Sequence, residues 1–487
     1  MARAALEEAR AEGAHMAIRV GRWSGGNGRW ACVLRGGAPI LWAMEGLDVG
    51  VVGAGFAGSA AALFLHRAGH RVTVYEAVED PAPVGAGILI QPTGMAVLAR
   101  LGLLHPVRAH GAVVDRLRCV TRGGRTLFDL PYGELRGGLH GLGLHRGVLF
   151  QVLFDQARAE GVPIRLGVHV AEIEEGHVVD AAGERHGPHD LVVVADGARS
   201  QIRAADFPTV LDAPYPWGAL WCVAEDPERV FARELFQVVD GTETMLGFLP
   251  TGFAPDGTTP LTSFFWSLRG DAEPRWRRAM QLHGLHRFKD VVRALEPRSA
   301  PLLDQLADHG ALLFAAYRDV RMRRWHHQAE GTRVVFIGDA AHAMSPQLGQ
   351  GSNLALYDAM GLADGLAGAS SLAEGLQAYQ RARESHLRFY GRINRWLTPF
   401  FQSRGRALGG LRDALFPVVT RLPWLRRQMV QVMAGVRRGF VLADPLPLPA
   451  LPPPSQADEG QGDEPGEGAA PRADADRTDA DRAAAAE

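Results

Sequence analysis

The sequence predicts an α/β protein in which a parallel sheet flanked by helices is interrupted by a mostly antiparallel sheet and followed by C-terminal helices. Three observations support this fold class. Residues 47–76 run in the order apolar strand, glycine-rich turn, helix and second strand. Two later apolar runs, 191–194 and 334–337, each lead into a glycine–aspartate pair. Residues 207–317 instead contain several β-like runs, most of them rich in aromatic residues, which are typical of antiparallel sheet.

The composition of the chain limits the functions to be considered. Its 487 residues are enough for two or three domains, and 47% hydrophobic with 22% charged residues is usual for a globular protein. The formal net charge of −2 gives no reason to expect nucleic acid as a partner. Three widely separated cysteines, Cys32, Cys119 and Cys222, predict neither a disulfide framework nor a metal site. Without a signal peptide or a membrane-spanning run, the sequence favours a cytoplasmic protein.

Residues 1–43 do not follow the pattern of the rest. They mix glycine and arginine without sustained periodicity, and Met44 precedes the first apolar strand by four residues. We therefore predict a poorly ordered extension, with translation starting at either Met1 or Met44. The alternative is an additional edge hairpin formed by residues 30–42.

The first motif is a turn between a strand and a helix. Gly53, Gly55 and Gly58 are spaced G-x-G-x-x-G after an apolar strand, and Glu76 ends the next strand. Such glycines permit a tight turn, a close approach of a pyrophosphate, and close packing of helix on strand. The helix N-terminus attracts the phosphates, and an acid about 20 residues further on accepts hydrogen bonds from a ribose. The motif predicts dinucleotide binding.

The next 130 residues contain two further signals. A loop after Glu76 leads to an expected helix at 95–103, strands are expected within 111–130, and Arg146 precedes an amphipathic helix. Arg146 either starts the helix in solvent or reaches a phosphate or ribose, and the sequence leaves both open. The apolar strand at 191–194 then ends in Asp196-Gly197, at the strand end where open α/β sheets bind ligands.

The last motif is the most specific one. An apolar strand at 334–337 is followed by Gly338-Asp339, then by a loop with Pro346, Gly349 and Gly351, and a helix is expected from about Asn353. An aspartate at a strand end can bind a polyol hydroxyl. The two glycines let backbone N–H groups at a helix N-terminus face an electron-rich ring.

Taken together, four stretches resemble the single-component FAD-dependent aromatic hydroxylases, the group that includes para-hydroxybenzoate, salicylate and ubiquinone-pathway hydroxylases. The stretches are VVGAGFAGSAAA…YE, LHRGVLF, DLVVVADGARSQIR and VVFIGDAAHAMSPQLGQGSNLALYDA, within about residues 47–400. The resemblance implies a Rossmann-type FAD-binding domain with an inserted β-sheet substrate domain. The implied parts are an extension at 1–43, the FAD domain at 44–206 and 318–371, the substrate domain at 207–317, helices at 372–443 and a disordered acidic tail at 444–487.

Roles for single residues follow from the same resemblance. Gly53, Gly55 and Gly58 would hold the FAD pyrophosphate, Glu76 the adenosine ribose, Arg146 the ribose and phosphate side, and Asp196 would serve both FAD and NAD(P)H. Asp339, after Gly338, would bind the ribityl chain, and Pro346, Gly349 and Gly351 would line the isoalloxazine. No metal ligand is implied, and the sequence identifies no catalytic base.

The implied reaction makes physical demands. NAD(P)H reduces the flavin, O2 adds at C4a, and the hydroperoxide must be kept from water until it hydroxylates an aromatic or similar apolar ring. An aromatic roof over the site is expected from the following side chains: Trp217, Trp221, Phe248, Phe264 and Trp266. The alternatives are an FAD-dependent reductase of the same fold acting on a prenyl chain, and a non-catalytic FAD-binding protein. A halogenase W-x-W-x-I-P run is absent.

The C-terminal part leaves two interpretations open. Residues 392–440 combine apolar residues at near-helical spacing with many arginines and a single acid, Asp413. They form either a helical layer packed on the FAD domain with solvated arginines, or a basic amphipathic surface that touches anionic lipid, which would make the protein membrane-peripheral. The tail from Leu451 has ten acids and three arginines and too few apolar residues to fold. The sequence does not indicate the oligomeric state.

Overall fold

The computed structural model describes residues 46–82, 85–255, 257–329, 331–439, 445–447 and Leu451, together with the backbone of three short strands near the N-terminus. These strands are β1 (Ile18–Arg22), β2 (Trp30–Leu34) and β3 (Ile40–Leu41), which form an antiparallel sheet of their own. The pairing of β2 with β3 falls within the predicted hairpin at 30–42. Met44 and most of the predicted acidic tail lie outside the described residues, so the start site and the disorder of the tail stay predictions.

A six-stranded sheet forms the centre of the α/β part. Its order is β10 (Ile164–Arg165), β5 (Arg71–Tyr75), β4 (Asp48–Val52), β14 (Leu191–Val194), β21 (Thr332–Phe336) and β20 (His326–Ala329). The first five strands are parallel and β20 is antiparallel to β21. The apolar runs are buried on both faces, as parallel strands covered by helices require. The predicted Rossmann-type α/β fold is confirmed.

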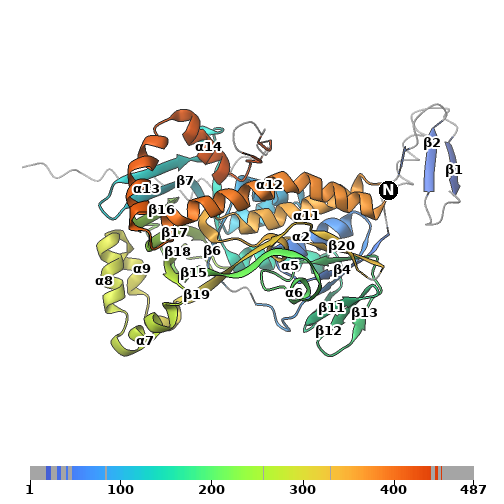
Figure 1. The fold of residues 1–487 in the computed structure, drawn as a ribbon, viewed down its shortest axis with the longest axis horizontal. Coiled ribbons are helices and arrows are strands. Elements are labelled where there is room, and N and C mark those ends of the chain that lie inside the picture. Colours follow the sequence, from blue (N-terminus) through green and yellow to red (C-terminus); the bar gives the residue numbers. More distant parts are fainter. Residues whose placement is uncertain are drawn as a thin grey trace, which may run out of the picture.

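Helices cover this sheet. Helix α2 (Phe56–Arg67) contacts both α5 (Arg146–Ala159) and α11 (Gly351–Ala367), and α11 packs against the long α12 (Leu372–Phe401). Figure 1 shows α11 and α12 running side by side along the molecule. The smaller helices are α3 (Pro92–Arg100), α4 (Leu104–Ala109), α6 (Gln201–Asp206) and α10 (Asp339–His342). A separate three-stranded sheet consists of β11 (Val170–Glu174), β12 (His177–Asp180) and β13 (Arg185–His186).

The second large sheet has nine strands. Its order is β19 (Leu313–Met322), β15 (Thr209–Glu225), β18 (Leu261–Arg269), β17 (Thr244–Gly252), β16 (Arg233–Asp240), β7 (Ala112–Thr121), β9 (Gly141–His145) and β6 (Gly87–Ile90), with β8 (Thr126–Pro131) on β7. All pairs are antiparallel except β16 with β7. The sheet therefore crosses the boundary expected at residue 207, because strands from 87–145 complete it.

The two faces of the nine-stranded sheet pack against different helices. One face buries Phe248 and Phe264 with Phe288 from α8, in a core shared with α7 (Glu273–His283), α8 (His286–Leu295) and α9 (Ala300–Asp304). Trp266 packs edge-on against Phe288 as well. These three aromatics point away from the opposite face, so the expected roof that included them is wrong. The alternation of side chains along a strand predicts that the sheet has two faces. Only the packing of α7, α8 and α9 determines which of these faces is buried in their core.

Three helices make up the C-terminal part of the described residues. After α12 come α13 (Arg406–Val419) and α14 (Pro423–Met433), which lie at the upper left of Figure 1. Their inner sides bury Val430 and Met433 against Phe128 and Phe401 of the second sheet and α12. None of the helices in the part of the chain that the structure describes combines the length and the apolar composition needed to cross a bilayer.

Candidate cofactor site

The glycine turn connects β4 to α2. Gly53 has φ +97°, and a Cβ there would lie 2.6 Å from the carbonyl oxygen of Ala195. At Gly58 a Cβ would lie 1.9 Å from the carbonyl oxygen of Gly53. Both glycines are therefore required by the protein itself, one by its backbone conformation and the other by the close approach of helix and turn.

Gly55 is different, and its surroundings test whether a cofactor fits. Its φ of −67° suits any residue, and a Cβ there would meet no atom within 4 Å. No contact of the described protein explains a glycine at this position. Open space at the N-terminus of a 12-residue helix is what a pyrophosphate needs for close approach to backbone N–H groups. The turn fits the phosphate part of FAD.

Glu76 and Arg146 lie on either side of this turn. The carboxylate of Glu76 accepts hydrogen bonds from Ala54 N at 2.7 Å and Val78 N at 3.0 Å, so it is held at the end of β5. Arg146 is the first residue of α5, and its guanidinium lies 5.5 Å from the ring centre of Phe56 in α2. Its side chain is exposed, and both residues contact the start of α2 or the turn before it.

Asp196 follows β14, the strand between β4 and β21. Its Oδ1 is buried and has no hydrogen-bond partner among the described residues. Burial raises the pKa of Asp196 to about 6, although Ser200 and Arg203 oppose that shift. A buried carboxylate oxygen without a donor is costly, and a ligand hydroxyl or amide would satisfy it.

Gly338 and Asp339 follow β21. Gly338 has φ +60°, and a Cβ added there would lie only 3.0 Å from the Cβ of Ala57 in α2. Asp339 is surrounded by protein, and that burial raises its pKa, opposed by the charges of His342 and Arg146. Its own surface is nevertheless accessible to solvent. Such a side chain faces an open space within the protein, as an acceptor for ribityl hydroxyls must.

The loop after α10 completes the arrangement. Pro346 begins a 3-10 turn (Pro346–Leu348), Gly349 follows it with φ +59°, and Gly351 opens α11. A Cβ at Gly349 would meet nothing within 4 Å, and one at Gly351 would come within 3.9 Å only of Asp339 Oδ1. The loop therefore presents bare backbone beside Asp339.

The structure brings three of the motifs together, because β4, β14 and β21 are adjacent and parallel and their carboxyl ends share one edge. The fourth motif joins them through Arg146, which lies against Phe56 of α2. Sequence reasoning missed two residues of α11 that hold this edge. Asn353 accepts from Gln91 N at 2.7 Å and donates to the carbonyls of Leu89 (3.1 Å) and Gly349 (3.2 Å). Asp358, fully buried, accepts from Gly338 N at 2.9 Å. For both residues, the only sign in the sequence is a polar residue within an otherwise mostly apolar helix.

The sheet face opposite the α8 core carries aromatic side chains from three strands. Trp221 of β15 contacts Phe265 of β18 with ring centres 5.1 Å apart, and its Nε1 donates to Tyr317 Oη of β19 at 2.9 Å. On the same side, Ser263 Oγ accepts from Gly87 N at 2.6 Å. Phe265 also packs against the cluster that contains Phe401 and Met433 of the C-terminal helices, whereas the charge of Arg146 acts on Tyr317. Trp221, Phe265 and Tyr317 therefore lie on the face opposite the α8 core.

Comparison with known proteins decides the family. The family described as "FAD binding domain" matches residues 46–240 and 304–388, more than half of the chain. The chain belongs to this family. The kynurenine 3-monooxygenase of Salinispora tropica is 33% identical over 368 residues, which are 69% of this chain and 76% of that protein. The phenazine 1,6-dicarboxylic acid hydroxylase PhzS of Lysobacter antibioticus is 28% identical over 373 residues, 69% and 86% of the two chains.

A solved structure shares the fold. A single-substitution variant of HpxO from Klebsiella pneumoniae, complexed with FAD, superposes with a TM-score of 0.66 at 21% identity, covering 80% of this chain and 99% of that one. The resemblance inferred from the four motifs is confirmed, and with it FAD as cofactor and the assignment as an FAD-dependent monooxygenase. The reductase and non-catalytic alternatives are not favoured, because the named relatives are monooxygenases.

Proposed function

We propose that this monooxygenase uses NAD(P)H and O2 to hydroxylate an aromatic ring. Relatives named for kynurenine and for a phenazine support the aromatic class. The observation in this chain that carries the proposal is the aromatic group of Trp221, Phe265 and Tyr317 on the sheet face opposite the α8 core, where the charge of Arg146 from the cofactor site acts on Tyr317. Flat aromatic side chains pack well against a flat apolar substrate.

Each candidate residue has a proposed role. The pyrophosphate would lie on Gly53, Gly55 and Gly58, and the adenosine ribose on Glu76. The remaining contacts would come from Arg146, Asp196, Gly338, Asp339, Pro346, Gly349 and Gly351. The chemistry that bound FAD supplies is the passage of two electrons from NAD(P)H to O2, with one oxygen atom inserted into the ring and the other released as water.

The residues on the substrate face orient the substrate and exclude water. Tyr317 Oη accepts the Trp221 N–H bond, so its own proton is available for donation to a polar group of the substrate. Burial raises the pKa of Tyr317 to about 12. Its hydroxyl therefore stays protonated at neutral pH and acts as a donor, not as a base.

The test is to purify the protein, record its flavin spectrum, and screen aromatic compounds for stimulated NADH or NADPH oxidation with oxygen uptake. We expect release of FAD on denaturation and a hydroxylated product from at least one aromatic compound. NAD(P)H oxidation that needs no O2 and reduces an isoprenoid would replace the proposal with the reductase alternative. A bound flavin that neither nicotinamide reduces would favour a non-catalytic role.

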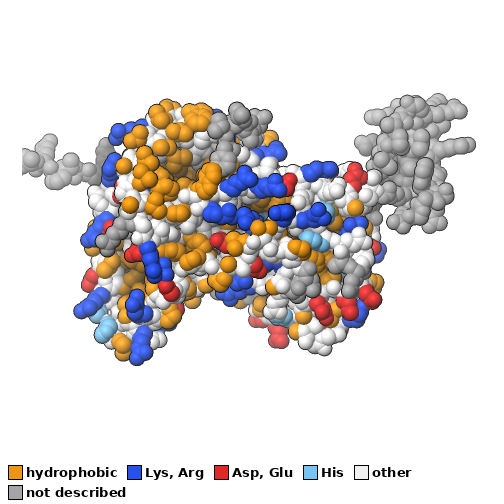
Figure 2. Space-filling view, in the orientation of Figure 1, with side chains coloured by type: hydrophobic (Ala, Val, Ile, Leu, Met, Phe, Trp, Pro, Cys, Tyr) orange, Lys and Arg blue, Asp and Glu red, His pale blue; other side chains and the backbone are white. Residues whose placement is uncertain are grey.

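We also propose that α13 and α14 contact an anionic lipid surface, as the amphipathic pattern of residues 392–440 suggested. Six of the twelve exposed large apolar side chains in the described residues lie in this segment: Trp396, Leu411, Leu415, Val418, Leu422 and Trp424. Figure 2 shows hydrophobic side chains gathered over these two helices. Exposed arginines at 404, 421 and 427 lie in the same segment. An apolar face with basic neighbours matches an anionic membrane interface.

Flotation with phosphatidylglycerol-containing vesicles, compared with phosphatidylcholine alone, tests this contact. Leu415→Gln with Leu422→Gln should abolish flotation, whereas Leu282→Gln, also exposed but on α7, should not. A chain truncated after Ala450 would show whether the acidic tail competes with lipid. Absence of binding by both the full and the truncated chain at low salt would contradict the contact.

A further inference from the structure

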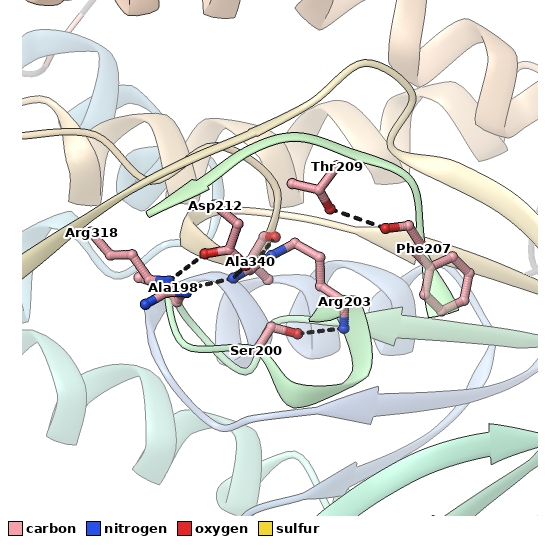
Figure 3. A network of polar contacts seen from close by, with 8 residues as sticks. All are labelled: Ala198, Ser200, Arg203, Phe207, Thr209, Asp212, Arg318 and Ala340. Atoms are coloured by element: carbon pink, nitrogen blue, oxygen red, sulfur yellow. Dashed lines mark hydrogen bonds and ion pairs between the residues drawn. The ribbon is translucent and has the colours of Figure 1, made fainter. Parts of the chain in front are cut away.

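One buried guanidinium contacts the turns that follow both cofactor-site aspartates. Arg203, in α6, has only 1% of its side chain exposed. Its Nη1 donates to the carbonyl of Ala340 at 2.8 Å, next to Asp339, and its Nη2 donates to the carbonyl of Ala198 at 2.7 Å, two residues after Asp196. Figure 3 shows the guanidinium between these turns. A single side chain thus fixes two strand ends relative to one another.

The same guanidinium is bound to the nine-stranded sheet. Arg203 Nη2 and Nε donate to Asp212 Oδ2 at 2.8 Å and 3.2 Å, and Asp212 belongs to β15. The other oxygen of Asp212 accepts from Arg318 Nε of β19. Burial raises the pKa of Asp212, but the hydrogen bonds from both arginines outweigh it and hold the pKa below its usual value. We name Arg203, Asp212 and Arg318 the bridge.

The two strands of the bridge are connections between the sheets. The chain passes from α6 of the α/β part into β15, and returns from β19 through β20 to β21. β15 and β19 pair antiparallel over this stretch, with Asp212 opposite Val320 and Pro214 opposite Arg318. Tyr317 is next to Arg318 in β19, and Trp221, its partner in the proposed substrate face, lies further along β15. Displacing the strand pair at the bridge would therefore displace the substrate face.

We propose that the bridge is a positioning unit that couples occupancy of the FAD site to the placement of the substrate face. This inference rests on the proposed function and deepens it. Its residues bind backbone and each other, and they act through the turns after Asp196 and Asp339 on one side and through β15 and β19 on the other. The two ends are separable, because Arg203 holds the turns whereas Arg318 contacts Asp212 on the strand pair.

Hydrogen exchange by mass spectrometry, with and without added FAD, measures the coupling directly and needs no identified substrate. In the parent protein, FAD should slow amide exchange at the turns (53–58, 196–200 and 338–351) and also in the strand pair (209–216 and 313–320). In Arg318→Gln, FAD should still protect the turns, but the added protection of the strand pair should be lost. Arg318→Lys, which keeps a charged donor, should restore most of it.

FAD titration of the apoproteins tests the other end. Arg203→Lys should raise the Kd for FAD about tenfold or more, the equivalent of one charge-assisted hydrogen bond. The matched control is Arg412→Lys. Arg412 is also fully buried and donates to two carbonyls, of Gly241 and Phe400, each at 2.9 Å, but Gly241 lies in the turn between β16 and β17 and Phe400 in α12, away from the turns that Arg203 contacts. The Arg412→Lys substitution should leave the Kd for FAD unchanged, and FAD should still protect both the turns and the strand pair from exchange.

The outcomes distinguish the inference from the proposed function. A parent protein that binds no FAD would overturn the proposed function. A parent that binds FAD without protecting the strand pair would overturn the coupling alone, as would an Arg318→Gln protein that keeps that protection. Should Arg203→Lys fail to fold, Arg318→Gln still decides, because its side chain is 31% exposed and its loss leaves Asp212 paired with Arg203.

Discussion

Replacing Asp358 by asparagine should destabilise the protein strongly, although the two side chains have nearly the same shape. Asp358 is fully buried in α11 and accepts from Arg383 Nε at 2.7 Å and from Gly338 N at 2.9 Å. Its Oδ2 also lies 2.5 Å from His342 Nε2. Asparagine keeps one oxygen, so its NH2 group must face at least one donor. Arg383, with 1% of its side chain exposed, would lose its counter-charge.

The expected magnitude follows from burial. Removing one partner of a buried ion pair costs about 3–5 kcal/mol, because the remaining charge is left without compensation. Asparagine keeps one acceptor and Arg383 still lies 4.6 Å from the ring centre of Tyr357, so we expect the lower end of that range, about 3 kcal/mol. That loss is a large fraction of the about 5–15 kcal/mol that stabilises a typical domain.

Urea unfolding of the apoprotein at pH 7 measures this loss. Asp364→Asn is the matched control, because Asp364 is on the same helix and pairs with Arg100 while 50% of its side chain is exposed. An exposed pair of this kind contributes about 0–1 kcal/mol. If Asp358→Asn shifted the free energy of unfolding no more than Asp364→Asn, the argument from buried charge would be refuted.

Three further predictions concern the cofactor site and its support. Gly55→Ala should leave the stability of the apoprotein unchanged and weaken FAD binding, whereas Gly58→Ala should lower both, as thermal unfolding and FAD titration would show. Asp339→Ala should weaken FAD retention by roughly 1.5–3 kcal/mol, and Glu76→Ala by less, in equilibrium dialysis; equal retention by the Asp339 variant and the parent would contradict the ribityl role. Burial lowers the pKa of His386 to about 3 from the usual 6.5, so the unfolded chain binds the extra proton between these values. His386 should therefore make the free energy of unfolding fall as pH drops through that window, and His386→Gln should show a shallower slope there than the parent.

Several features were determined by the sequence alone because they depend on short-range chemistry. The strand at 191–194 was predicted with its observed bounds, and the helix expected near Asn353 begins at Gly351. A turn that needs φ > 0, a helix N-terminus and an acid at a strand end are each specified within about ten residues. Parallel strands then bring such ends to one edge whatever their separation in sequence, so the candidate cofactor residues could be predicted together.

Only the tertiary structure decided the features that depend on distant partners. The pairing of β7 with β16 joins residues more than a hundred positions apart and carries the nine-stranded sheet across the boundary expected at 207. The alternation of side chains along β15 and β18 predicts two faces, but only packing against α8 showed that Phe264 and Trp266 lie in that core while Trp221 and Phe265 lie on the opposite face. Likewise, nothing local marks Arg203 as the contact of two distant turns. An arginine looks the same in sequence whether its five donors meet water or protein, and only the folded chain determines which.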